Sequence, residues 1–396
     1  MNDLWTALQK DSSPILLYGM GNGADKILSV CKRKGIEISG VFASDGFARG
    51  NLYRGMPVLS FREAKERFGD FRVLLSFASS RPEVLETISL VAGERTLYVP
   101  DVPVAGENLF DKDFLDAHMQ DFKRAREILE DDLSKDVFDT VISCKLYGEL
   151  HFFDRNLSTE EEDFNTILHP GDYRICGDFG AYSGDTAKDL ARRCPLLQQI
   201  LSVEPDAKTF LRLQKNTAGL PVLPIHAALW DKEETLLFTS GGNRGSGVDA
   251  PGKKQTEVQG ICGDRLFEKL HADYLKFDVE GAELRALQGL SGTILRDKPD
   301  LLISCYHRPE DLFLLPLYVK KHFPFYRLYL RRHRASPPGT STSMPQKKGT
   351  VYGSEPSFSK QCFANGSVFL QIALCFCSCA IFWPSAPFRE NFCPEK

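Results

Sequence analysis

The amino-acid sequence predicts an α/β protein in which two Rossmann-like units are joined by a helical connector. In two stretches, short apolar runs alternate with segments of helical length, which is the pattern of parallel strands covered by helices. At 396 residues the chain is also too long for one ordinary core. We therefore expect a small α/β domain over residues 1–104, a connector over 105–170, a larger α/β domain over 171–334 and a tail over 335–396.

The smaller unit comes first and is expected to contain four strands. They cover residues 15–18, 36–42, 73–77 and 96–99, with a helix that ends at Lys34. Pro100, Pro103 and Gly106 then interrupt the pattern, so this unit should end near Val104.

A glycine-rich turn, Gly19-Met20-Gly21-Asn22-Gly23, follows the first strand, and Asp45 lies near the end of the next one. This is a partial dinucleotide-binding fingerprint, and a G-x-G-x-G alone is a weak signal. About 90 residues are too few for a complete six-strand dinucleotide fold. Two interpretations stay open for the turn: a nucleotide site, and a structural or regulatory role.

The connector and the larger unit follow in order. Residues 111–170 are rich in acids and helix formers, with apolar residues at helical spacing. After Pro170 the alternation resumes, and we expect strands at 173–176, 200–203, 222–227, 235–238, 274–277, 301–305 and 326–330. Helices should end at Arg193, Asn216 and Leu290. From Ala335 the composition is that of a linker.

The turn after the first strand of the larger unit is the most informative segment. It reads DFGAYSGDT over residues 178–186 and opens a helix. Its glycines let the backbone approach a ligand, and the helix start adds a positive end. An acid at Asp178 would repel a pyrophosphate but suits a cofactor that carries an ammonium group. The candidate cofactor-binding residues here are Asp178, Gly180, Tyr182, Ser183, Gly184, Asp185 and Thr186.

The next strand ends in Glu204-Pro205-Asp206, which places a carboxylate at the neighbouring strand end. A carboxylate there can accept both ribose hydroxyls of an adenosine group. A site for an amino-acid end beside a site for a ribose describes S-adenosylmethionine. We therefore expect Glu204, Pro205 and Asp206 to contribute to binding this cofactor.

Further acids follow the strand at 274–277. Lys276, Asp278, Glu280 and Glu283 should face the same edge of the sheet, since open α/β sheets bind ligands at the carboxyl ends of their strands. Glu283 has an equally good alternative role as a helix cap. His307 lies just beyond the next strand, where a neutral imidazole could take a proton from an acceptor hydroxyl.

From these residues we expect Asp278 and His307 to be the candidate bases, with Lys276 beside them in the catalytic group. Glu280 and Glu283 are the candidate acceptor-binding residues. Methyl transfer is a direct displacement at a sulfonium, so the protein must mainly align the acceptor oxygen and exclude water. No metal site is predicted.

Five ordered motifs together resemble the FkbM family of methyltransferases: residues 178–186, 204–206, 226–231 (HAALWD), 276–283 (KFDVEGAE) and 305–312 (CYHRPEDL). The resemblance runs from about Asp172 to Arg334. It implies a Rossmann-like methyltransferase fold that uses S-adenosylmethionine to O-methylate hydroxyls, often on sugars or secondary metabolites, and it adds Ala228 to the cofactor-binding candidates. The family pattern closes with one more strand, for which Gly349–Tyr352 is the candidate.

Composition and charge limit the kinds of partner that the chain is expected to bind. A net charge of −4 gives no reason to expect nucleic acid, and the first residues do not resemble a secretory signal, so the cytoplasm is the expected location. The acceptor should be a small molecule or a saccharide. The apolar run Val368–Trp383 is shorter than the roughly 20 residues that cross a bilayer, and the cysteines around it lack zinc-site spacing. We expect the tail to contribute little to the core and to make no membrane contact.

Two alternatives from other classes remain. One is a non-catalytic nucleotide-sensing or scaffold protein built on two Rossmann-like units, which predicts ligand binding without turnover. The other is an oxidoreductase that works through the N-terminal glycine turn.

Overall fold

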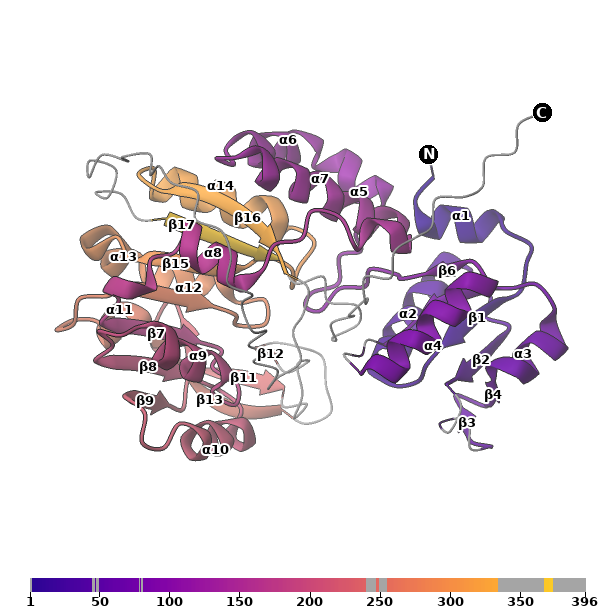
Figure 1. Cartoon of the computed structure of the whole chain (residues 1–396), viewed down its shortest axis with the longest axis horizontal. Helices are drawn as coiled ribbons and strands as arrows, with labels where there is room; N and C mark the ends of the chain where they lie inside the picture. Colours follow the sequence, from indigo (N-terminus) through magenta and orange to yellow (C-terminus); the bar gives the residue numbers. More distant parts are fainter. Residues whose placement is uncertain are drawn as a thin grey trace, which may run out of the picture.

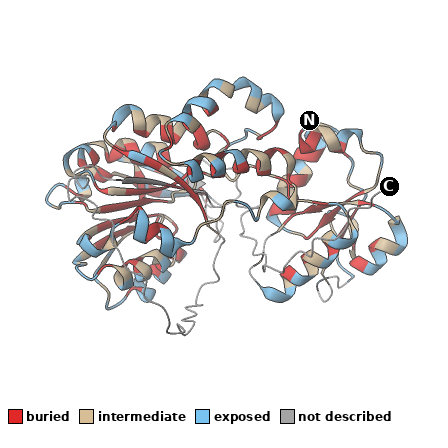
Figure 2. Cartoon of the chain, turned by 45° about the horizontal axis from the view of Figure 1, so that its top comes forward, coloured by how far each residue is buried: buried red, intermediate tan, exposed pale blue. Residues whose placement is uncertain are grey.

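The computed structural model describes residues 2–44, 47, 50–77, 79, 81–239, 247–248, 255–333 and 367–372. Two α/β units lie at opposite ends of the molecule, and the helices that follow the first unit lie against the second (Figure 1). Buried residues concentrate on the strands of both sheets, while the outer faces of the helices are exposed (Figure 2). The α/β class predicted from the sequence is confirmed.

The first sheet has six strands in the order β3-β4-β2-β1-β5-β6. Its pairs are parallel except for the antiparallel pair of β3 and β4. The elements are α1 (Leu4–Lys10), β1 (Ile15–Tyr18), α2 (Asn22–Lys34), β2 (Gly40–Ala43), β3 (Leu52–Tyr53), β4 (Met56–Ser60), α3 (Phe61–Phe68), β5 (Arg72–Leu75), α4 (Pro82–Glu94) and β6 (Leu97–Tyr98).

Local sequence explains most of these bounds. All four residues of β1 are buried because helices cover both faces of the sheet. Helix α2 ends at Gly35, whose φ of 68° is easy for glycine. Strand β2 begins at Gly40 and not at Ile36, so the prediction there was too long. The pair β3–β4 was not predicted, because Leu52 of the short β3 is exposed and Val58 is the buried residue of β4.

The connector contains α5 (Lys112–Ala117), α6 (Met119–Glu127), α7 (Asp132–Tyr147) and α8 (Glu160–Thr166), with short 3-10 turns at Leu150–Phe152 and Pro170–Asp172. Its apolar side chains share one core with the second sheet. The rings of Phe122 in α6 and Phe313 in α14 (Asp311–His322), for example, lie 4.9 Å apart. The connector therefore packs as part of the second unit.

The second sheet has seven strands in the order β16-β17-β15-β14-β7-β8-β9, and all of its pairs are parallel. The elements are β7 (Ile175–Phe179), α9 (Asp185–Arg193), β8 (Gln199–Val203), α10 (Ala207–Asn216), β9 (Val222–Ile225), β14 (Tyr274–Phe277), α12 (Glu283–Gly289), α13 (Ser291–Asp297), β15 (Asp300–Ser304), α14, β16 (Arg327–Arg332) and β17 (Ser367–Ile372).

A separate four-stranded sheet has the order β10-β13-β11-β12. It contains β10 (Ala228–Trp230), β11 (Glu234–Thr239), β12 (Gly247–Val248) and β13 (Gln255–Cys262), and the short α11 (Gly263–Leu266) follows it. Only β11 was expected. In β13, polar residues fill most exposed positions and leave just Val258 and Gly260 buried, so the apolar signal of a strand is weak there.

Strand β17 corrects the prediction for the tail. It lies between β15 and β16, and Leu370 is fully buried in the core of the second unit. The expectation that residues 335–396 contribute little to the core was therefore wrong. The alternative strand candidate Gly349–Tyr352 lies outside the described residues. Among the residues that the structure describes, no helix is long and apolar enough to cross a membrane.

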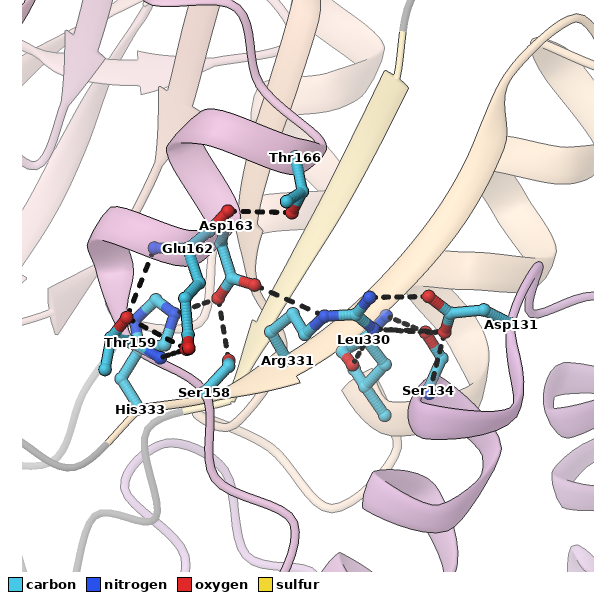
Figure 3. A network of polar contacts seen from close by, with 10 residues as sticks. All are labelled: Asp131, Ser134, Ser158, Thr159, Glu162, Asp163, Thr166, Leu330, Arg331 and His333. Carbon is cyan, nitrogen blue, oxygen red and sulfur yellow. Dashed lines mark hydrogen bonds and ion pairs between the residues drawn. The ribbon is translucent and has the colours of Figure 1, made fainter. Parts of the chain in front are cut away.

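A buried arginine joins the connector to the edge of the second sheet (Figure 3). Arg331 of β16 contacts Asp131, the N-cap of α7, at 2.5 Å and Asp163 of α8 at 3.3 Å. Ser134 accepts a further hydrogen bond from the guanidinium at 2.7 Å, and His333 contacts Asp163. Because Arg331 and Asp163 are both nearly inaccessible, each charge depends on the other for compensation.

Candidate active site

The candidate site lies at the carboxyl ends of β7, β8, β14 and β15. Strand β7 is the point where the order of the sheet reverses, because β8 and β9 lie on one side of it and β14 and β15 on the other. Ligands of open α/β sheets bind at such a reversal. The structure therefore brings together the segments at 178–186, 204–206, 276–283 and 305–308, as the sequence predicted.

Two positions in the turn after β7 must be glycine because of packing contacts within the protein. Gly180 has a φ of 77°, and a Cβ there would lie 1.8 Å from the backbone oxygen of Asp278. Gly184 has a φ of 89°, and its Cβ would collide with Thr217 at 2.6 Å. These glycines let the turns after β7 and β14 touch, and let α9 start close to α10.

Tyr182, between these glycines, adopts a left-handed backbone with a φ of 47°. This conformation is uncommon for a residue that is not glycine and often marks a functional turn. It aims the backbone N–H of Tyr182 at the Glu204 carboxylate, 2.9 Å away. Ser183 donates to Asp185 at 3.2 Å, so its hydroxyl is used within the turn.

Glu204 is buried at the end of β8 and accepts one backbone N–H on each oxygen. The donors are Tyr182 at 2.9 Å and Asp206 at 2.8 Å. Burial raises the pKa of Glu204 to about 7 despite these two hydrogen bonds. The carboxylate is thus oriented and incompletely compensated, and each oxygen keeps a lone pair for a further donor.

Other predicted cofactor-binding residues have different tasks. Asp206 caps α10, where its Oδ1 accepts from the backbone of Lys208 and Thr209. The backbone oxygen of Pro205 lies 3.1 Å from His226 Nε2. Ala228 is buried in β10, just after the end of β9. The side chain of Glu204 keeps capacity for a ligand hydroxyl, whereas Oδ1 of Asp206 is used to cap α10.

Lys276 links two carboxylates across adjacent strands. Its register partner in β7 is Asp178, whose Oδ1 lies 3.2 Å from the Lys276 Nζ, and Asp278 Oδ2 lies 3.8 Å away. Burial works against the charge on Lys276, but Asp178 and Asp278 raise its pKa, so the amine stays protonated. Burial raises the pKa of Asp178, and Lys276 offsets only part of that shift.

The second oxygen of Asp178 is inaccessible and accepts no hydrogen bond from the described part of the protein. Buried carboxylate oxygens are nearly always paired. Asp178 therefore keeps an acceptor oxygen that the described residues do not use.

His307 is surrounded by three carboxylates. Its Nδ1 lies 2.9 Å from Glu283, while its Nε2 lies 3.5 Å from Asp278 and 3.6 Å from Glu280. The distances are those of ion pairs, although neither ring nitrogen has the angles of a hydrogen bond. Burial opposes the charged form, but the three acids outweigh it and raise the pKa of His307 to about 10.

The expected role of His307 as a neutral base therefore conflicts with its surroundings. At pH 7 the ring is an imidazolium and has no free lone pair to accept a proton. Burial alone would raise the pKa of Asp278, but Lys276, His307 and hydrogen bonds from Ser304 and Tyr306 hold it below its usual value. Asp278 is thus the ionised side chain of the site that can accept a proton.

Glu283 is also out of reach of a methyl acceptor. Its side chain is fully buried, and Oε1 accepts from the backbone of Val279 at 3.0 Å and of Gly281 at 3.4 Å. It holds the turn between β14 and α12 and orients His307, which is the alternative capping role considered from the sequence. Asp278 and Glu280, whose side chains are 32% and 29% exposed, form the open face of the cluster.

Two contributors were not singled out from the sequence. The Tyr306 hydroxyl donates to Asp278 Oδ1 at 2.9 Å, and Arg308 Nε donates to the backbone oxygen of Gly281 at 2.9 Å. Both flank His307 in the motif at 305–312, so their position in that motif was the available signal. In the described residues, no group of three or more His, Cys, Asp or Glu side chains has the arrangement of a metal site.

Comparison with known proteins bears on this geometry. Residues 178–336 match the family model described as the methyltransferase FkbM domain, and the match begins at Asp178 itself. The chain contains an FkbM methyltransferase domain. It is accordingly a methyltransferase, and the FkbM domain contains all four strand ends described above.

The fold is similar to the crystal structure of methyltransferase FkbM from Methylobacillus flagellatus KT. The TM-score is 0.62 at 18% sequence identity, over 83% of this chain and 89% of that chain. The similarity therefore extends beyond the FkbM domain into other parts of the fold. No curated protein sequence matches the chain.

Proposed function

We propose that this chain transfers the methyl group of S-adenosylmethionine to a hydroxyl of a saccharide or another small molecule. The observation that carries the proposal is the convergence of Asp178, Glu204 and Asp278 at three adjacent strand ends beside the reversal of the sheet. Asp178 and Glu204 fit S-adenosylmethionine, and Asp278 fits the hydroxyl that receives the methyl group.

The fit to the donor rests on two carboxylates. Glu204 is oriented by two backbone amides and can accept the ribose hydroxyls of the donor. Asp178 has a buried oxygen that accepts no hydrogen bond from the described residues, and its negative charge suits the ammonium group of S-adenosylmethionine. When bound, S-adenosylmethionine supplies an electrophilic methyl group on a sulfonium.

Asp278 is the residue that would take the acceptor proton. Lys276, His307 and Tyr306 keep it ionised and fix its two oxygens, while about a third of its side chain stays exposed to an incoming hydroxyl. Glu280 sits beside it, on the other side of His307 Nε2, and can accept a hydrogen bond from the same molecule. Because the carboxylate is held in place, its role is to orient the hydroxyl and to receive its proton.

Calorimetry with S-adenosylmethionine and with NAD⁺ tests the proposal, followed by measurement of S-adenosylhomocysteine release with a panel of methyl glycosides. We expect binding of S-adenosylmethionine and release that depends on a glycoside. Binding of S-adenosylmethionine without turnover of any acceptor would favour a sensing or scaffold protein. Binding of NAD⁺ alone would favour an oxidoreductase.

A further inference from the structure

The segment that leaves the first unit, Val104 to Gly106, lies against the turns that carry Glu280 and His307. The backbone N–H of Ala105 donates to the backbone oxygen of His307 at 3.0 Å. A Cβ built on Gly281, next to Glu280, would lie 2.7 Å from the Cβ of Ala105. Ala105 therefore touches the turn that carries Asp278 and Glu280 and also the turn that carries His307.

Arg308 completes this contact. Its Nε donates to the Gly281 oxygen at 2.9 Å, and a Cβ on Gly106 would lie 3.2 Å from its Nη1. With a φ of 96°, Gly281 has both the backbone and the space that let Ala105 and Arg308 approach. The segment is thus fitted against the turn that carries Glu280.

The position of the segment is set from the first unit. Lys26, on α2, donates from its Nζ to the backbone oxygens of Pro103 at 3.0 Å and Val104 at 3.2 Å. Hydrogen bonds from a charged donor are among the stronger ones in proteins. One amine of the first unit therefore holds two consecutive carbonyls directly before the residue that contacts His307 and Gly281.

We propose that Val104, Ala105 and Gly106 form one side of the acceptor site, and that Lys26 is a positioning residue for it. The inference rests on the proposed function, because it assigns a boundary to the acceptor of that reaction. It gives the first unit a task in choosing the acceptor, and it leaves the donor end, at Glu204 and Asp178, independent of Lys26.

The full chain with Lys26→Met tests this, because methionine keeps the length of the side chain and removes its donors. Lys32→Met is the matched control, since Lys32 is an exposed lysine on the same helix. Lys26→Arg restores a cation that can donate to both carbonyls. The measurements are the affinity for S-adenosylmethionine, amide exchange at Ala105, and KM and kcat with a mixture of methyl glycosides of glucose, galactose, mannose and rhamnose.

For Lys26→Met we expect exchange at Ala105 to rise by about tenfold and the glycoside KM to rise by at least about fivefold. Donor affinity should match that of the wild-type chain, Lys32→Met should behave as wild type, and Lys26→Arg should recover most of the loss. Unchanged exchange at Ala105, unchanged KM, or an equal loss of donor affinity would overturn the proposal. If the wild-type chain binds the donor but methylates no glycoside, the hydroxyl-transfer function fails, and exchange at Ala105 still decides whether Lys26 holds the segment.

Discussion

The pKa of each carboxylate in this site depends on its neighbours more than on its residue type. Asp178, Glu204 and Asp278 lie at the ends of neighbouring strands, yet burial raises the pKa of the first two while cations hold that of Asp278 low. Groups whose surroundings push their pKa values apart are typical of sites that bind and transfer protons. The residue types alone do not reveal this difference.

The raised pKa of Glu204 predicts that donor affinity depends on pH. The ionised carboxylate accepts ribose hydroxyls better than the acid, so affinity should be constant above pH 7 and fall by up to about tenfold per pH unit below it. Because the folded pKa exceeds the usual value, ionisation also costs stability as the pH rises through about 7. Calorimetry from pH 5.5 to 8.5 measures the affinity.

Glu204→Gln should bind the donor more weakly at pH 8 and lose this pH dependence. Glu204→Ala should lose more affinity than the same change at an exposed glutamate, because contacts worth about 1.5 to 3 kcal/mol each disappear before compensation. Glu268→Gln, at an exposed position of the same unit, is the control. An unchanged affinity in both Glu204 variants would remove this residue from the site.

The imidazolium of His307 predicts the direction in which a pH profile moves. Replacing it in His307→Gln removes a cation beside Asp278, so the pKa of Asp278 should rise and the acid limb of kcat/KM should shift to higher pH. At pH 7 we expect roughly a tenfold loss of rate or more. His322→Gln, at an exposed residue of α14, controls for the loss of a histidine. A shift to lower pH would contradict the assignment of charge.

At the scale of elements, the edge of the second sheet depends on one buried ion network. Among the described residues, Arg331→Met leaves the buried Asp163 with only His333 as an ionisable partner. The change also removes the cation that helps to hold the pKa of Asp131 low against its burial. We expect the free energy of unfolding to fall by about 3 kcal/mol, as measured by urea denaturation. Arg327→Met changes an exposed arginine of the same strand and should cost less than about 1 kcal/mol. Equal effects of the two changes would refute the network's role.

How far the sequence predicts these elements depends on burial. Strands such as β1 and β14 were located at their true bounds, because all of their residues are buried between helices and, apart from Lys276, they read as apolar runs. The strand ends then placed Glu204 and Asp278 at one site. The charge of His307 and the burial of Glu283 could not be read in this way, because they arise from contacts between separate turns. Strand β17 was missed since its surroundings resemble a linker.

At the scale of the whole molecule, polar contacts and apolar packing both join the first unit to the connector, since Leu109, Leu150 and Phe153 pack against the core of the first unit. Lys145 of α7 is almost fully buried and contacts Asp101 at 3.0 Å, and the backbone of Val99 donates to Gly148 at 2.7 Å. Lys34, at the end of α2, contacts Asp111 at 2.7 Å. None of these contacts involves the donor end of the site.

Removal of residues 1–104 should therefore leave the affinity for S-adenosylmethionine within about threefold of the wild type. The truncation also removes Asp101, so the shortened chain should carry Lys145→Met to avoid a buried unpaired charge. Calorimetry on the folded fragment measures the affinity. A folded fragment that no longer binds the donor would show that the first unit completes the donor site.

Strand β17 also predicts that the chain cannot be shortened after Tyr352. The buried Leu370 lies between β15 and β16, so a chain that ends at Tyr352 should melt far lower or fail to fold. Leu370→Ala in the full chain should cost about 2 to 5 kcal/mol of unfolding free energy. Leu295→Ala, at an exposed leucine, is the control. If the shortened chain melts at the same temperature as the full-length chain, β17 is dispensable.

The place of β17 also sets an order of events during synthesis. The ribosome releases β15 and β16 before residues 367–372, yet these two strands have no pairing with each other in the finished sheet. Until the last segment emerges, each presents an open edge of backbone donors and acceptors that another chain could occupy. The sheet can close only when the final strand enters between two strands already made. Completion of the methyltransferase domain is therefore delayed until residues 367–372 have been translated, and a nascent chain that stalls before this point leaves the facing edges of β15 and β16 uncovered.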